Sequence, residues 1–195
     1  MIITRLFGGA GNQLFQYAAG RMLADHLGTE LALDRRYMAL WDNTRSDCFF
    51  NHGNARFVDE VDLPPAKMNG MLRYGLWRYF GRTTRFHRED GLGFNTAYFD
   101  LPDHTYLNGY WQSERYFHQA ADRIRSDLKM TTPLDGANQG VADQIAAVEI
   151  PVSVHVRRGD YVNDGGFATC SPEYYRTAVA LLREETGGAL TCFVF

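Results

Sequence analysis

Hydrophobic and polar positions group into two blocks, each of which predicts a strand, a helix and a second strand. In the first block, the apolar run from Ile2 to Leu6 predicts a strand that leads into a glycine-rich loop. Apolar residues then recur with a helical period over residues 14–27, and Gly28 predicts the end of that helix. Residues 30–33 predict the next strand. This block therefore reads as a βαβ unit.

The second block lies near the end of the chain. Residues 152–156 predict a strand, and Ser171 followed by Pro172 predicts the start of a helix that runs to about residue 185. Residues 190–195 predict another buried parallel strand. Two parallel strands do not form a domain with a core of its own, so we expect the chain to be one piece of a longer protein.

The middle of the chain has a less regular pattern. Residues 35–103 are rich in aromatic side chains and arginine, and scattered turn signals predict irregular helices and loops there. Residues 105–111 predict a strand, and Ser113 is a candidate cap for an amphipathic helix that follows it. A polar stretch then marks a boundary between two domains. We place an N-terminal α/β domain at residues 1–140 and the start of a second domain at residues 141–195.

Composition and charge exclude several classes of protein. The chain has 195 residues, of which 45% are hydrophobic, enough to fill a core. Its formal net charge of −3 indicates neither a nucleic-acid groove nor a polybasic membrane patch. Cys48, Cys170 and Cys192 are too widely spaced for a zinc site or a disulfide framework, and we expect reduced thiols. Neither a signal peptide nor a membrane-spanning stretch is visible, which predicts a soluble intracellular protein.

Two adjacent arginines follow the strand of the second block. Arg157 and Arg158 precede Gly159 and Asp160, and arginine binds phosphate or carboxylate through a planar fork of donors. Ligands of open α/β sheets bind outside the carboxyl ends of the strands, so this position predicts a phosphorylated ligand. The alternatives are a surface salt-bridge cluster closed by Asp160 and an integrin-binding Arg-Gly-Asp tripeptide. His155, between two valines, is typical of a buried core histidine.

The glycine loop of the first block is a second candidate site. Gly9 and Gly11 match part of a dinucleotide-binding fingerprint, but Leu14 occupies the third glycine position, which makes that match weak. A phosphate-binding P-loop is excluded because no Lys-Ser or Lys-Thr comes after the glycines. A glycine loop with Asn12 as helix cap still offers free N–H donors at a positive dipole end. The alternative is a tight turn that binds no ligand.

An aromatic cluster lies between the two blocks. Aromatic rings can pack against sugars, but rings on a strand and an amphipathic helix more often belong to the hydrophobic core. We favour the core interpretation here. Its members are Tyr106, Tyr110, Trp111, Tyr116 and Phe117.

Four segments together resemble one enzyme family. Residues 7–18 (FGGAGNQLFQYA) resemble the GGLGNQLFQYA opening of the α-1,2-fucosyltransferases, glycosyltransferase family 11. Residues 107–117 (LNGYWQSERYF) are similar to their central GYWQSEKYF segment. Residues 155–161 (HVRRGDY) are similar to a motif shared with α-1,6- and protein O-fucosyltransferases. Residues 170–175 (CSPEYY) resemble the C-S-x-x-Y-Y segment that follows this motif in the family. The matches are collinear and span the chain.

The resemblance implies a GT-B-like α/β fold of two Rossmann-type domains, the second incomplete in this chain, with the active site between them. It implies GDP-β-L-fucose as donor, a galactose-terminated glycan as acceptor, an α-1,2 linkage formed with inversion, and neither a metal nor another cofactor. It also implies a cytoplasmic enzyme that can associate peripherally with the inner face of the membrane, without nucleic acid. The alternatives are an inactive remnant that binds nucleotide or glycan only, and another nucleotide-sugar glycosyltransferase.

The resemblance also implies roles for individual residues. Arg157 and Arg158 would bind the diphosphate and act in catalysis, and Asp160 would orient them or serve as general base. The implied substrate-binding residues are Gly8, Gly9, Gly11, Asn12, Gln13, His155, Gly159 and Tyr161. Two departures from the family pattern stand out. Ala10 replaces the usual leucine, and the family's chains continue past Phe195 with an acidic segment that is expected to form much of the nucleotide pocket.

Overall fold

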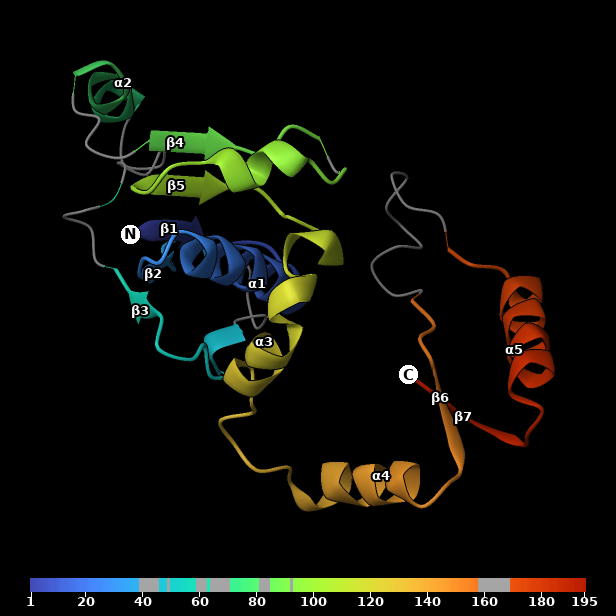
Figure 1. Ribbon diagram of the computed structural model, residues 1–195. Helices are drawn as coiled ribbons and strands as arrows, with labels where there is room; N and C mark the ends of the chain where they lie inside the picture. The colour runs from blue at the N-terminus through green and yellow to red at the C-terminus, as the bar shows by residue number, and fades with distance from the viewer. Residues whose placement is uncertain are drawn as a thin grey trace. The chain divides into compact units, whose positions relative to one another are not determined.

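The computed structural model describes residues 1–38, 46–48, 50–58, 63, 71–80, 85–91, 93–157 and 169–195. It divides the chain into two compact units, Met1–Thr132 and Pro133–Phe195 (Figure 1). The sheets of both units are parallel, which confirms the predicted α/β class.

Most elements belong to the first unit. Its elements are β1 (Ile2–Arg5), α1 (Ala10–His26), β2 (Leu31–Asp34), η2 (Ser46–Cys48), β3 (Arg56–Phe57), α2 (Met71–Phe80), β4 (Arg85–Arg88), η5 (Thr96–Asp100), β5 (Thr105–Asn108), η6 (Glu114–Tyr116), η7 (His118–Ala120) and α3 (Ala121–Asp127). Those of the second unit are α4 (Gly136–Ala146), β6 (Ile150–Val154), α5 (Pro172–Thr186) and β7 (Leu190–Val194).

The sheet of the first unit has the strand order β3-β2-β1-β5-β4. The chain first moves outward from β1 to β2 and β3, and β5 later pairs with the opposite side of β1. The order therefore reverses between β1 and β5. In open α/β sheets, the ligand crevice lies at the carboxyl ends of the strands at such a switch point.

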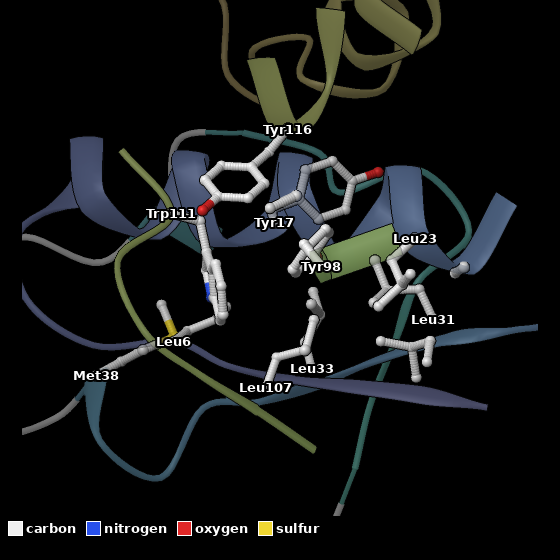
Figure 2. Packing of buried hydrophobic residues seen from close by; sticks show 13 residues of the cluster. Leu6, Tyr17, Leu23, Leu31, Leu33, Met38, Tyr98, Leu107, Trp111 and Tyr116 are labelled. Carbon is white, nitrogen blue, oxygen red and sulfur yellow. The ribbon is translucent and has the colours of Figure 1, made fainter. Parts of the chain in front are cut away.

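Alternate residues of the central strands enter two separate cores, one on each face of the sheet. Ile2 and Leu33 belong to the larger core, whereas Ile3 and Ala32 belong to the smaller one. Figure 2 shows the aromatic part of the larger core, where the buried rings lie against α1. The buried aromatic side chains include Tyr17, Tyr98, Trp111 and Tyr116, with Tyr106 in the smaller core. The core interpretation of the aromatic cluster is confirmed for Tyr106, Trp111 and Tyr116.

Several elements differ from the sequence-based expectation. Helix α1 begins at Ala10 with Gly9 as its N-cap, so the prediction that Asn12 caps it is wrong. The amphipathic helix expected after Ser113 is broken into η6, η7 and α3, because Phe117 leaves helical geometry at φ −145°. Strand β4 lies in a region that the sequence pattern predicts to be irregular. Arg85 and Arg88 are exposed at the sheet edge, so β4 gives only a weak strand pattern.

The second unit is a βαβ arrangement with little burial. Ser171 Oγ accepts a hydrogen bond from the Tyr174 N–H at the start of α5, and Gly187 ends the helix at φ 64°, as the sequence predicted. The expected burial of the last strand is wrong. No described residue from 133 to 195 is buried, although β6 and β7 pair along five residues. The polar boundary stretch is also partly helical, since α4 begins at Gly136.

Helix α1 lies very close to β1, and Gly20 makes this approach possible. A methyl group added at Gly20 would lie 3.0 Å from Leu31 Cδ1 and 3.1 Å from Thr4 Cβ, both in the buried interface. These distances are shorter than ordinary van der Waals contacts. Gly11, on the same helix, has no such neighbour within 4 Å.

We therefore predict that the same substitution at these two glycines has different effects on the free energy of unfolding. Gly20→Ala should lower the free energy of unfolding by about 1–3 kcal/mol through overpacking, despite the better helix propensity of alanine. Gly11→Ala should leave it unchanged or raise it by up to about 1 kcal/mol. Urea unfolding followed by circular dichroism measures both, and equal losses in the two variants would contradict this packing account.

Candidate functional site

The loop between β1 and α1 is fixed by a buried glutamine. Gly8 has φ 75°, which favours glycine, and it turns the chain from the strand into the helix. Gln16 is fully buried, and its side-chain amide pairs with the backbone of Phe7 in both directions. The Phe7 N–H donates to Gln16 Oε1 at 2.9 Å, and Gln16 Nε2 donates to the Phe7 carbonyl at 3.2 Å. The loop conformation is therefore set from inside the core.

Gln13 forms a second internal support. Its Nε2 donates to the Gly8 carbonyl at 2.7 Å, and its Oε1 accepts from the Ser46 N–H at 2.8 Å. Ser46 Oγ lies 3.2 Å from His52 Nε2, and burial lowers the pKa of His52, which keeps this imidazole neutral near pH 7. The resemblance would place Gln13 facing the cleft. In the structure Gln13 is fully buried, so it positions the loop instead of lining its surface.

The outer side of the loop is open. Methyl groups added at Gly9 or Gly11 would have no atom within 4 Å. The first turn of α1 contains no acidic residue and no side-chain cap, so its N–H groups and the positive end of the helix dipole are suited to an anion. Asn12 stands beside this surface, where its Oδ1 accepts from Gln112 Nε2 at 2.6 Å.

A pocket of about 330 Å³ opens at the carboxyl ends of β1, β5 and β4, at the switch point of the sheet. Its lining residues are Arg5, Phe7, Arg88, Glu89, Gly91, Asn108, Gly109 and Tyr110. The Phe7 and Tyr110 rings form one wall, with centroids 4.6 Å apart. Arg5 Nη1 donates to Asn108 Oδ1 at 3.0 Å, whereas its Nε is buried without a hydrogen-bond partner in the described structure. The pocket thus combines an aromatic wall with polar groups.

Glu89 shapes the rim of this pocket. Its carboxylate accepts the backbone N–H of Tyr110 at 2.6 Å and that of Trp111 at 3.1 Å. Trp111 has φ 55°, an uncommon conformation for a bulky residue, and this carboxylate helps to hold it. The Trp111 ring then enters the core, while the Tyr110 ring lines the pocket. Glu89 is therefore a positioning residue.

Asp34 disfavours the dinucleotide-binding interpretation of the glycine loop. That fingerprint needs an acidic residue about 20 positions after the glycines to bind a ribose hydroxyl, and Asp34 at the end of β2 is the candidate. Its carboxylate is fully buried and accepts two hydrogen bonds from the Arg36 guanidinium at 2.9 and 2.8 Å. The Tyr106 hydroxyl donates to it at 2.7 Å. Because the Asp34 oxygens already accept these hydrogen bonds inside the protein, they are not available to a ribose hydroxyl.

The second unit places part of the HVRRGDY segment beside the end of its sheet. The parallel pairing continues past β6, because the Val156 N–H donates to the Phe195 carbonyl at 2.9 Å. His155 and Arg157 are exposed on the same face, so the core interpretation of His155 is wrong. The Tyr175 hydroxyl donates to the His155 carbonyl at 3.2 Å and ties α5 to the strand end. Arg158, Gly159, Asp160 and Tyr161 lie outside the described residues.

Sequence reasoning missed several of these groups. Arg5 is a cation at the last position of an apolar strand, a signal that could have been noticed. Glu89 follows a strand that the pattern did not reveal, so its position at a strand end was hidden. Among the described residues, no cluster of three His, Cys, Asp or Glu side chains could hold a metal ion.

A comparison with known protein families shows which family the chain belongs to. The sequence profile described as Glycosyl transferase family 11 matches residues 89–192, more than half of the chain. The chain belongs to this family. The family 11 match begins at Glu89 and includes both Trp111 and Arg157, so its sequence range contains residues of both units. The resemblance inferred from the motifs is thereby confirmed.

Two individual proteins are also similar to this chain. The α-1,2-colitosyltransferase of Escherichia coli is 26% identical over 212 residues, and the match covers all of this chain and 68% of that protein. Among solved structures, the α-1,6-fucosyltransferase NodZ soaked with GDP-fucose is 15% identical, with a TM-score of 0.47. That match covers 99% of this chain and 69% of NodZ.

Proposed function

We propose that this family 11 glycosyltransferase moves L-fucose from GDP-β-L-fucose to the 2-hydroxyl of a galactose-terminated glycan. The anomeric C–O bond to the diphosphate breaks, and a new C–O bond forms to the acceptor oxygen with inversion. The acceptor hydroxyl loses its proton to a general base, for which Asp160 is our candidate. The observation that carries this proposal is that the family 11 match includes Arg157, which is exposed at the end of a strand.

Charge stabilisation on the departing diphosphate is the main chemical requirement. The family resemblance implies a reaction without a metal ion, so arginine side chains would have to stabilise that charge. Arg157 follows the extended pairing of β6 and β7, at the carboxyl end where α/β proteins bind ligands. We assign Arg157 to the diphosphate, together with Arg158. We also propose that Gly9, Gly11 and Asn12 of the glycine loop take part in substrate binding.

The test of Arg157 is a transfer assay with GDP-fucose and lactose. Arg157→Lys should keep the positive charge but lose the planar fork, and turnover should fall about a hundredfold to a thousandfold. Arg183→Lys, at an exposed position on α5, is the matched control and should retain wild-type turnover.

Wild-type turnover in Arg157→Lys would contradict the assignment of this residue. If the unaltered chain binds GDP-fucose but transfers nothing to any galactoside, the alternative of a non-catalytic binding protein replaces the proposal.

We further propose that the pocket beside Arg5 receives the acceptor sugar. Sugars have apolar ring faces and polar edges, and this pocket offers the Phe7–Tyr110 wall beside Asn108 and the half-buried Arg5 side chain. Glu89 fixes the backbone that carries Tyr110, so the wall is formed before a ligand binds. Such preorganisation favours affinity because little order is lost on binding.

Tyr110→Ala should therefore separate acceptor from donor binding. We expect the KM for the acceptor to rise roughly tenfold and the KM for GDP-fucose to change by less than about twofold. Tyr79→Ala, at an exposed tyrosine on α2, serves as control. Equal increases in both KM values would show that Tyr110 acts on the fold or the donor site instead.

A second candidate function is transfer of colitose. The E. coli relative that aligns with the whole chain is a colitosyltransferase, and the described residues contain no feature that distinguishes the two sugars. A competition assay with nucleotide-activated fucose and colitose decides between them. Preferred use of colitose would replace fucose in the proposal and leave the assignments of Arg157 and the acceptor pocket unchanged.

A further inference from the structure

A basic and aromatic segment of the first unit takes no part in the proposed reaction. Residues 63–85 contain five lysine and arginine residues and no aspartate or glutamate. Acidic residues border the segment, with Asp62 just before it and Glu89 and Asp90 shortly after it, so the net charge of −3 gave no indication of its basic character. The same segment contains Tyr74, Trp77, Tyr79 and Phe80.

Helix α2 in this segment exposes an unusually apolar face. The exposed fractions are 84% for Met71, 85% for Leu72, 61% for Leu76 and 80% for Tyr79. At 100° per residue these side chains fall within an arc of about 140° on one side of the helix. Together with Gly75 they line a shallow groove of about 420 Å³. Contiguous exposed apolar patches of this kind mark interaction sites.

Other features of α2 are typical of a helix that lies on a membrane. Arg73 is exposed, and the Tyr74 and Trp77 rings contact each other with centroids 5.9 Å apart. Interfacial helices combine an apolar face, aromatic rings and basic residues. Among the described helices, none is long and apolar enough to span a membrane. Figure 1 draws α2 outside the layer formed by α1 and the sheet.

We propose that α2, together with the exposed Arg73 and Arg85, binds the surface of an anionic lipid bilayer, with Leu72, Leu76 and Tyr79 inserted among the lipids. Charge complementarity selects this occupant. A second copy of the chain would bring the same positive segment against itself, and like charges would oppose that pairing. An anionic bilayer offers apolar and negative groups together, which match both properties of the segment. This inference does not depend on the proposed function.

The test is co-sedimentation of the full chain with vesicles. Wild type should bind vesicles of phosphatidylcholine and phosphatidylglycerol, bind pure phosphatidylcholine at least tenfold more weakly, and be released by high salt. The double variant Leu72→Glu/Leu76→Glu should lose at least tenfold in binding. Val141→Glu, at a half-exposed apolar position on α4, is the matched control and should bind as wild type does. Circular dichroism of each variant verifies folding.

A second pair of variants tests charge without altering the apolar face. Arg73→Gln and Arg85→Gln replace exposed arginines, and each should weaken binding to the anionic vesicles roughly fivefold. Absence of wild-type binding to anionic vesicles would overturn the proposal, as would equal binding to neutral ones. A concentration-dependent dimer that Leu72→Glu/Leu76→Glu dissociates would also overturn it, because the face would then be covered by a second copy.

Discussion

Two buried glutamines hold the loop on which the site in the first unit depends. Gln16 pairs with the backbone of Phe7, and Gln13 connects Gly8 to Ser46, so both amides satisfy backbone groups inside the core. An unsatisfied polar group at these depths would cost about 1–3 kcal/mol, which makes alternative loop conformations unfavourable. The loop can therefore keep its outer surface free of side-chain contacts at Gly9 and Gly11.

The strand order places this loop where binding chemistry is expected. Because β5 pairs with β1 on the side away from β2, the ends of β1 and β5 meet at the switch point. Residues about one hundred positions apart become neighbours there: Arg5 contacts Asn108, and Asn12 contacts Gln112. Glu89 adds the end of β4 to the same edge. The pocket is thus a consequence of the topology, and the family match contains two of its three strand ends.

The sequence predicted the parts of the fold that repeat locally. The βαβ unit of β1, α1 and β2 and the cap of α5 at Ser171 follow from periodicity and turn chemistry, and both are present. The sheet edge β4 and the pocket could not be predicted, because they depend on contacts between distant residues and on strands with exposed polar side chains. Gln13 could not be assigned from the sequence for a similar reason. The motif identifies the residue, but only its burial in the folded chain shows that it supports the loop.

The central proposal is that Arg157 binds the nucleotide of the donor and that the glycine loop takes part in substrate binding. Titration of the isotopically labelled chain with GDP, followed by two-dimensional NMR, tests it most directly. The account predicts saturable shifts of the Gly9 and Gly11 amide signals and of the Arg157 Nε–H signal. Gly28 and Gly187, which end α1 and α5, should remain unchanged and report on the rest of the fold. Saturable GDP binding that leaves Gly9, Gly11 and Arg157 unshifted would contradict the account.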